Sequence, residues 1–166
     1  MKITADTSVL IRAAVQDDAR QARQAAKVMQ EADLVAVPIP VLCEFVWVLR
    51  RGYKRSVADI SDAIHRLMDG ANVVMNRPAV EAGLSVLGAG GDFADGIIAY
   101  EGDWLGAEEF VSFDSKSVSI LQSQGSRARL LGVLGLKALT GFANGDPPDR
   151  SRTAQVTDHS RPEKSA

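Results

Sequence analysis

The stretch KITAD at residues 2–6 is a short β-prone run that ends in an acid, and it decides the fold. Similar short apolar runs predict further strands at residues 34–37, 72–75, 110–113 and 128–131. Helical apolar spacing fills the intervals between strands, at residues 17–32, 39–51, 56–69, 77–87 and 93–105. Strands joined by helix-length connections indicate βαβ units. We therefore predict an α/β protein, a three-layer α/β/α sandwich around a central, mainly parallel sheet.

The composition is that of a globular protein with one principal domain. The chain has 166 residues, of which 46% are hydrophobic, and a formal net charge of −2. We expect the folded domain to span residues 1–142, and residues 143–166, rich in Pro, Asp, Ser and Arg, to form a disordered C-terminal tail. The 130–142 stretch is apolar, and we expect it to pack on the domain or on a partner.

The sequence predicts a cytoplasmic protein that does not enter a membrane. Cys43 is the only cysteine, which excludes an internal disulfide framework and a Cys-rich zinc module and suits a reducing compartment. No apolar run reaches the roughly 18 residues that a membrane span requires. The opening MKITADTSVL has an acid at position 6 and no long apolar core, so we do not expect a signal peptide.

Two acids follow predicted strands directly: Asp6 ends the first strand, and Asp114 ends the strand at residues 110–113. Open α/β sheets bind ligands at the carboxyl ends of their strands, so we expect both side chains to point into one crevice. The alternative is that each caps the segment that follows it, a role that aspartate fills well.

Glu44 lies in the apolar string VLCEFVWVL at residues 41–49. Its helical neighbours three and four positions away include Val41, Trp47 and Val48, which predicts that Glu44 occupies an apolar face. A carboxylate there has to be paired, protonated or bound to a metal. A salt bridge to an arginine, or a partly exposed position at the edge of that face, would also account for it.

Asp92 and Asp95 stand three residues apart at the start of a predicted helix and so share a face. Asp92 is a natural N-cap. Asp95 precedes an apolar stripe through Ile98 and Ala99, which again places a carboxylate beside a buried face. Its alternative role is that of the acidic partner in a capping box.

The acids Asp6, Glu44, Asp95 and Asp114 together predict a metal site. Carboxylates converging on one crevice repel one another unless a cation lies among them. Oxygen ligands without His or Cys favour Mg²⁺ or Mn²⁺ over zinc. Such ions activate water for the hydrolysis of phosphodiester bonds, which is the chemistry that we predict.

Four motifs in this order resemble the PIN domain family, and more narrowly the VapC-type toxin ribonucleases of bacterial toxin–antitoxin systems. They are DTSVL at 6–10, the glutamate of VLCEFV at 41–46, DFADGIIA at 92–99 and SFD at 112–114. The resemblance covers residues 1–131 and implies an RNA-cleaving enzyme that often forms a homodimer. It also implies inhibition by a cognate antitoxin protein, whose C-terminal arm occupies the active-site groove.

The resemblance implies that Asp6, Glu44, Asp95 and Asp114 are the catalytic acids that hold Mg²⁺ or Mn²⁺. Thr7 or Ser8 would support the first aspartate or a metal-bound water, and Asp92 would assist from its capping position. Gly96 stands where family members commonly have alanine, a small departure that we expect not to affect the metal.

Several alternatives differ in their requirements. A haloacid-dehalogenase-like phosphatase needs a second aspartate two positions after the first, where this chain has Ser8. A response-regulator receiver needs an aspartate at the end of the 72–75 strand, and none is there. A non-catalytic PIN-like module for protein or RNA binding remains, although such a module has no need of all four acids. The basic group Arg50, Arg51, Lys54 and Arg55 would contact RNA phosphates or complement a helix end.

Overall fold

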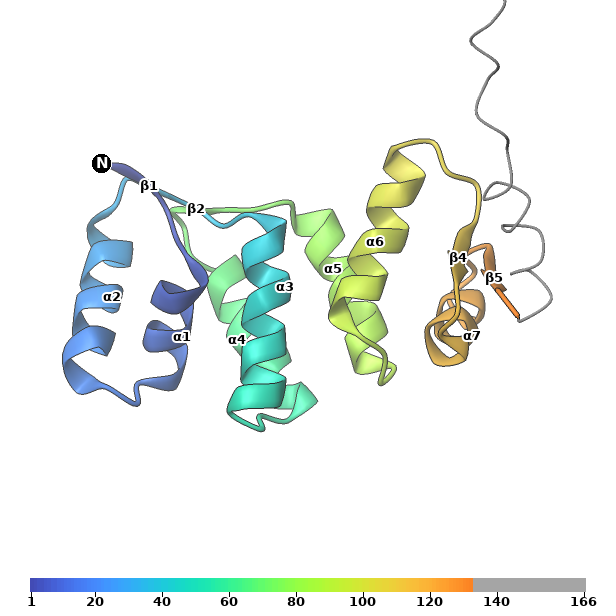
Figure 1. Cartoon of the computed structure of the whole chain (residues 1–166). Coiled ribbons are helices and arrows are strands. Elements are labelled where there is room, and N and C mark those ends of the chain that lie inside the picture. Colours follow the sequence, from blue (N-terminus) through green and yellow to red (C-terminus); the bar gives the residue numbers. More distant parts are fainter. Residues whose placement is uncertain (133–166) are drawn as a thin grey trace, which may run out of the picture. The chain divides into compact units, whose positions relative to one another are not determined.

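Strands and helices alternate along the chain in the computed structural model, which describes residues 1–132 (Figure 1). The strands are β1 (Lys2–Thr4), β2 (Leu34–Ala36), β3 (Val73–Val74), β4 (Phe110–Ser112) and β5 (Ala128–Leu130). The helices are α1 (Thr7–Val15), α2 (Ala19–Glu31), α3 (Ile39–Trp47), α4 (Val57–Met68), α5 (Arg77–Gly88), α6 (Phe93–Trp104) and α7 (Ser115–Ser123). A π-helical turn, η1 (Val48–Gly52), continues α3. The expected tail at 143–166 and most of the 130–142 stretch lie outside the described residues.

All strand pairings among the described residues are parallel, as the alternating pattern predicts. β1 pairs with β2 in the register Ile3↔Val35, and β2 pairs with β3 in the register Val35↔Val73. β4 pairs separately with β5, with Phe110 opposite Ala128. The five strands therefore form two parallel sheets, β1–β2–β3 and β4–β5, and β1 has no neighbour on its other side within the described residues.

Helix starts coincide with capping residues. Ser56 and Asp59 form the predicted capping box at α4, in which each side chain accepts a hydrogen bond from the other's backbone N–H. Asp92 caps α6 by accepting from Ala94 N at 3.0 Å. α1 and α7, which the apolar spacing did not predict, begin directly after Asp6 and Asp114.

The larger core lies where α1, α3, α4 and α5 meet the sheet β1–β2–β3. Its fully buried side chains include Val35, Phe45, Ile64, Leu87 and Phe93. A smaller cluster supports the sheet β4–β5 and consists of the buried residues Val86, Val118, Leu121 and Ala128. Val86 belongs to α5, so this helix contributes to both clusters.

Helices α5 and α6 pack so closely that their backbones touch. A Cβ atom added at Gly96 would lie 2.3 Å from the carbonyl oxygen of Ala82, and one added at Gly83 would lie 2.7 Å from the ring of Phe93. Only glycine permits this approach at both positions. The contact sets the position of the first turn of α6, which carries Asp95.

Candidate functional site

Asp6 stands between β1 and α1 and caps the helix. Its Oδ2 atom accepts hydrogen bonds from the Ser8 backbone N–H at 3.3 Å and from the Ser8 hydroxyl at 2.8 Å. These bonds, the hydroxyl's above all, lower the pKa of the Asp6 carboxyl below its ordinary value of 3.8. The side chain is exposed, so a carboxylate here is ionised and accessible.

The prediction that Glu44 occupies an apolar face is wrong, because Glu44 lies on the exposed side of α3. The buried side of this helix is made by Leu42, Phe45 and Val46, which turn toward the core. The carboxylate is nevertheless held in place, because the buried Thr7 hydroxyl donates to Glu44 Oε2 at 2.7 Å.

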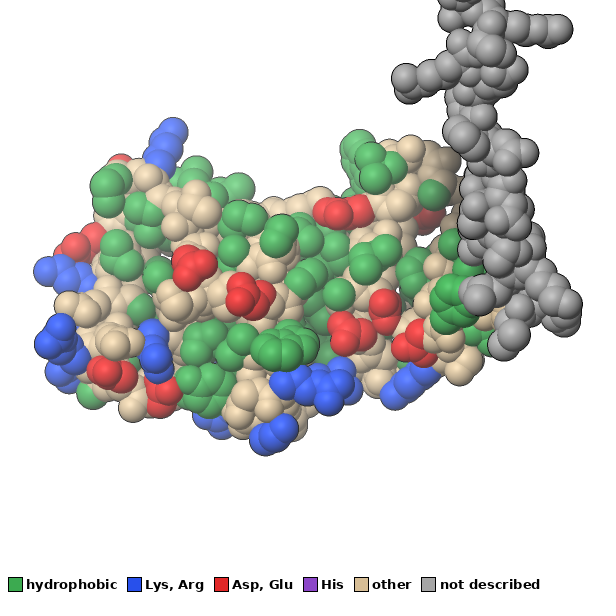
Figure 2. Space-filling view, in the orientation of Figure 1, with side chains coloured by type: hydrophobic (Ala, Val, Ile, Leu, Met, Phe, Trp, Pro, Cys, Tyr) green, Lys and Arg blue, Asp and Glu red, His purple; other side chains and the backbone are tan. Residues whose placement is uncertain are grey.

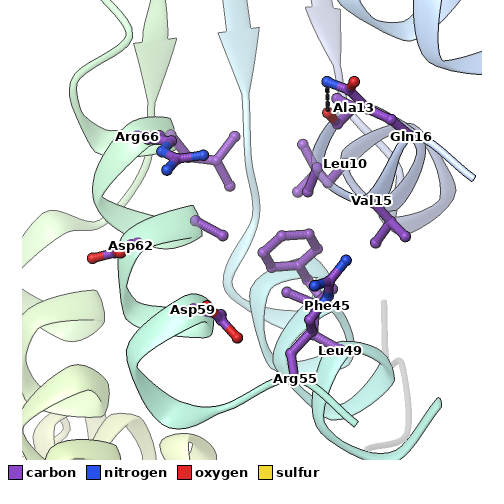
Figure 3. Close-up of a pocket in the computed structure, with 13 residues that line it drawn as sticks. Leu10, Ala13, Val15, Gln16, Phe45, Leu49, Arg55, Asp59, Asp62 and Arg66 are labelled. Carbon is purple, nitrogen blue, oxygen red and sulfur yellow. Dashed lines mark hydrogen bonds between the residues drawn. The ribbon is translucent and has the colours of Figure 1, made fainter. Parts of the chain in front are cut away.

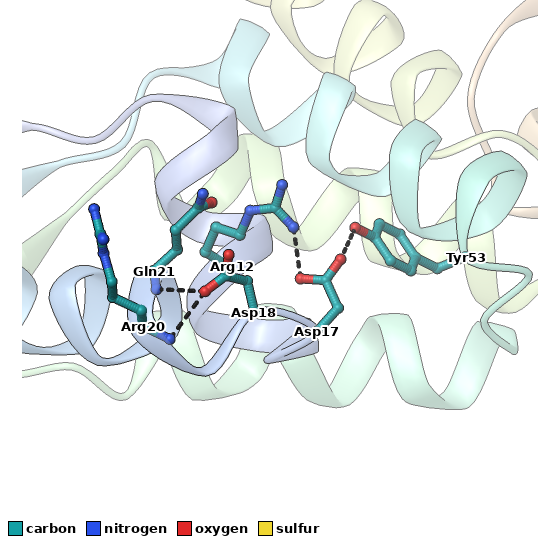
Figure 4. Close-up of polar contacts among 6 residues, drawn as sticks. All are labelled: Arg12, Asp17, Asp18, Arg20, Gln21 and Tyr53. Atoms are coloured by element: carbon teal, nitrogen blue, oxygen red, sulfur yellow. Dashed lines mark hydrogen bonds and ion pairs between the residues drawn. The ribbon is translucent and has the colours of Figure 1, made fainter.

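Asp6, Thr7, Ser8 and Glu44 line one open cavity of about 280 Å³. The cavity wall also contains Arg12, whose guanidinium donates to Asp17 at 2.6 Å, while the Tyr53 hydroxyl donates to the other oxygen of Asp17 at 2.7 Å (Figure 4). Asp17 raises the pKa of Arg12 through this hydrogen bond. The cavity wall therefore contains two carboxylates, from Asp6 and Glu44, and two hydroxyls, from Thr7 and Ser8. The guanidinium of Arg12 is already paired with Asp17.

A second pair of acids forms at the starts of α6 and α7. Asp114 caps α7, and its Oδ1 atom accepts from the backbone N–H groups of Lys116 at 2.8 Å and Ser117 at 3.3 Å. These bonds, the one from Ser117 first, lower the pKa of the Asp114 carboxyl. Asp95, in the first turn of α6, accepts a hydrogen bond from the Ser117 hydroxyl.

Asp92 has the capping role that the sequence predicts for it. It is exposed, and its carboxylate accepts from the backbone of Ala94. Asp95 is only partly exposed and bonds to Ser117, so the two acids have different neighbours although they are three residues apart.

The structure brings the predicted acids together as two pairs, Asp6 with Glu44 and Asp95 with Asp114, and not as one quartet. Among residues 1–132, no three His, Cys, Asp or Glu side chains are close enough to hold one metal ion. Asp6 follows β1 and Asp114 follows β4, and these strands are hydrogen-bonded into different sheets. The expectation of a single crevice therefore does not match this arrangement.

Sequence reasoning missed Ser117, which links the second pair. It is 1% exposed, whereas Ser115 and Lys116 just before it are exposed. The sequence could have indicated Ser117 by its position three residues after Asp114, the acid that ends a strand. Residues three apart lie on the same face of a helix, so the Ser117 hydroxyl lies on the face of α7 that carries the capping acid.

A larger cavity of about 360 Å³ lies between α1, η1 and α4 and contains none of the four acids (Figure 3). Leu10, Phe45 and Leu49 form its apolar floor, and Arg55 and Asp59 stand at its rim. Arg55 belongs to the basic group that the sequence singles out. Arg50 of that group donates to the Gly91 carbonyl oxygen at 3.2 Å, which ties η1 to the loop between α5 and α6.

On the face that Figure 2 shows, acidic and basic side chains both occur, and no basic patch covers the whole face. In Figure 2, acidic side chains lie across the middle of the visible face, and basic ones lie mainly along its left and lower edges.

No helix in the described part of the chain is long and apolar enough to cross a membrane.

Comparison with known proteins identifies the family. The PIN domain model matches residues 3–115, which include the positions of all four predicted acids. No curated protein matches the chain. PIN domains have a three-layer α/β/α fold, as predicted here, and are generally nucleases that use divalent metals. Because the match covers more than half of the sequence, the chain belongs to the PIN domain family.

Proposed function

We propose that this PIN domain is an Mg²⁺- or Mn²⁺-dependent endoribonuclease that acts as the toxin of a toxin–antitoxin pair. The observation that carries the proposal is the placement of the acids. Asp6 and Asp114 each stand at the carboxyl end of a parallel strand, and each has a second acid beside the helix that follows, Glu44 and Asp95 respectively. Acids in this position are typical of ligand sites in α/β proteins.

The donor atoms suit a hard divalent ion. Both pairs offer carboxylate oxygens with hydroxyl groups beside them, and neither includes a histidine or cysteine ligand. Asp6, Glu44, Asp95 and Asp114 are the residues that would hold the ion, which requires the two pairs to approach each other more closely than they do in this structure. The chemistry that such an ion would supply there is the activation of water for hydrolysis of an RNA phosphodiester bond, with a 5′-phosphate and a 3′-hydroxyl as the expected products.

The protein's own residues keep Asp6 and Asp114 ionised and orient Glu44. The hydrogen bonds from Ser8 to Asp6, and from the first turn of α7 to Asp114, favour the charged carboxylates. Thr7 fixes the orientation of Glu44. Hydroxyl and amide donors around ligating carboxylates are a general means of orienting them toward a metal.

The proposal requires the two pairs to act as one centre. If they do, Asp6→Asn and Asp114→Asn will each abolish binding at the same high-affinity Mn²⁺ site in calorimetric titrations. If the pairs act separately, each variant will leave the other pair's binding intact. The second outcome would favour the non-catalytic binding module, because a nuclease centre of this kind needs acids from both strands.

Cleavage of an RNA pool tests the enzymatic function directly. Purified protein is incubated with total RNA and Mg²⁺, Mn²⁺ or EDTA, beside Asp6→Ala. Asp18→Ala is a matched control, because Asp18 caps α2 as Asp6 caps α1 but lies outside both acid pairs. Both variants lose a helix cap worth about 0.5–2 kcal/mol of stability. A difference in cleavage between them therefore reflects the role of Asp6 in the reaction and not the loss of a cap.

We expect discrete metal-dependent products from the wild type and Asp18→Ala, and none from Asp6→Ala. Full activity of Asp6→Ala would refute the proposal. The toxin role predicts growth arrest when the wild-type chain is expressed and normal growth with Asp6→Ala. An antitoxin and a homodimer are the partners that we expect, and a small DNA-binding protein encoded next to this chain is the candidate antitoxin.

A further inference from the structure

Two polar side chains are buried among residues 1–132, and both are hydroxyls directed at candidate metal ligands. Thr7 is 6% exposed and Ser117 is 1% exposed. Thr7 donates to Glu44, and Ser117 donates to Asp95. Buried polar groups require hydrogen-bond partners, and here both partners are carboxylates of the proposed centre.

Ser117 contacts both acids of its pair through different atoms. Its backbone N–H donates to Asp114 Oδ1 at 3.3 Å, and its hydroxyl donates to Asp95 Oδ2. Asp95 belongs to α6 and Asp114 caps α7, so one residue joins carboxylates from two helix starts. The relative placement of the two carboxylates therefore depends on Ser117.

The direction of the Ser117 hydroxyl is not required by the helix itself. A serine within a helix satisfies its hydroxyl by donating to the carbonyl three or four residues earlier. Ser117 instead donates across to α6. Alanine would suit the helix better on propensity alone, so the serine needs another explanation.

We propose that Ser117 is a positioning residue that orients Asp95 and Asp114 toward the divalent ion. The inference rests on the proposed function, and it adds to the site a residue that the motifs did not include. Residues that hydrogen-bond to metal ligands affect metal affinity by about 10- to 100-fold. Ser117 thus has the same relation to Asp95 that Thr7 has to Glu44.

The test compares Mn²⁺ affinity in Ser117→Ala with that in Ser119→Ala. Ser119 lies on the same helix but is exposed, so the control repeats the substitution away from the acids. The free Mn²⁺ concentration is followed by EPR during titration of the folded protein, and urea unfolding of the metal-free protein is measured in parallel. We expect Ser117→Ala to bind Mn²⁺ about 10- to 100-fold more weakly, and Ser119→Ala to match the wild type.

A merely structural serine would lower the urea midpoint of the metal-free protein while leaving the Mn²⁺ affinity of the folded protein unchanged, and that result would overturn the inference. If Ser117→Ala does not fold, Ser117→Cys provides the test, since it keeps the size of the side chain but is a weak donor. Its Mn²⁺ affinity is expected to fall as well, and wild-type affinity would overturn the inference. A wild type that neither binds Mn²⁺ nor cleaves RNA would instead refute the proposed function itself.

Discussion

The contact between α5 and α6 makes Gly96→Ala the most informative single substitution in the fold. A Cβ atom at this position would lie 2.3 Å from the Ala82 carbonyl oxygen, 2.8 Å from the Ala82 carbonyl carbon and 2.9 Å from Gly83 Cα. All three are backbone atoms of α5, so none can move away by a side-chain rotation. The helices have to separate, although glycine in place of the alanine that is common in the family was expected to be a small departure.

The magnitude follows from two opposing effects. Overpacking a core costs about 1–3 kcal/mol, and a backbone-on-backbone clash belongs at the upper end of that range. Replacing glycine by alanine inside a helix returns about 1 kcal/mol through helix propensity. We therefore expect Gly96→Ala to lower the free energy of unfolding by about 2 kcal/mol, from ~3 kcal/mol lost and ~1 kcal/mol regained.

Urea unfolding followed by circular dichroism measures this difference. Gly102→Ala is the matched control, because Gly102 lies on the same helix and its added Cβ would meet only Ala107 at 3.9 Å, an ordinary contact. The control is expected to be unchanged or more stable by up to about 1 kcal/mol. If Gly96→Ala is as stable as Gly102→Ala, the close approach of α5 and α6 is wrong.

Two further substitutions test the fold and the first acid pair. Asn72→Ala removes an amide that donates at 2.8 Å to the carbonyl oxygens of both Met29 and Ala32. The substitution should lower the free energy of unfolding in urea by about 1–3 kcal/mol. An unchanged urea midpoint would contradict these two hydrogen bonds. Ser8→Ala removes the main cause of the lowered Asp6 pKa, so the pKa should rise in a ¹³C carboxyl NMR titration. Because the folded pKa lies below the unfolded one, the ionised Asp6 stabilises the fold above its unfolded pKa and this stability is lost as the pH falls through the folded pKa. Ser8→Ala should therefore lose less stability over that acidic range than the wild type does, and an identical pH profile would count against the hydrogen bond.

Local patterns predicted the strands and the longer helices within one or two residues at most ends. The helix expected at residues 56–69 is α4, with Ser56 and Asp59 in the predicted capping box. α1 and α7 were missed because their sequences, TSVLIRAAV and SKSVSILQS, are rich in β-branched residues or serine. Such residues lower intrinsic helix propensity, and in these two segments capping and burial outweigh it.

The exposure of Glu44 shows why an apolar helix is difficult to orient from sequence. In α3 nearly every position is apolar, so the neighbours of any residue three or four positions away are apolar on both sides of the helix. The side that faces the core is set by tertiary packing, here through Leu42, Phe45 and Val46. The glutamate remains a candidate ligand, but it is exposed and not buried.

Local sequence patterns do not predict the order of the strands either, because that order is also set by tertiary packing. The apolar runs indicate where strands form and which acids follow them, and parallel pairing follows from the helical connections. Which strand lies beside which depends on contacts between distant segments, such as Ile3 with Val35 and Phe110 with Ala128. The expectation of a single crevice was drawn from which acids follow strands, and the sequence does not contain the order of those strands.

One local rule would have found both halves of the candidate site. Among residues 1–132, the helices that begin at an aspartate cap are α1, α2, α6 and α7, with caps Asp6, Asp18, Asp92 and Asp114. Within three residues of the cap, only α1 and α7 carry a hydroxyl side chain, and in both a hydroxyl of that first turn is buried and reaches an acid on another helix. Asp6 and Asp114 each follow a strand, so the first turns of α1 and α7 lie beside strand ends, and a hydroxyl of each turn holds a second carboxylate nearby. The pairing of a cap with a first-turn hydroxyl therefore distinguishes the two helix starts whose capping acids follow a strand from those of α2 and α6, although the first turn of α6 carries the candidate acid Asp95.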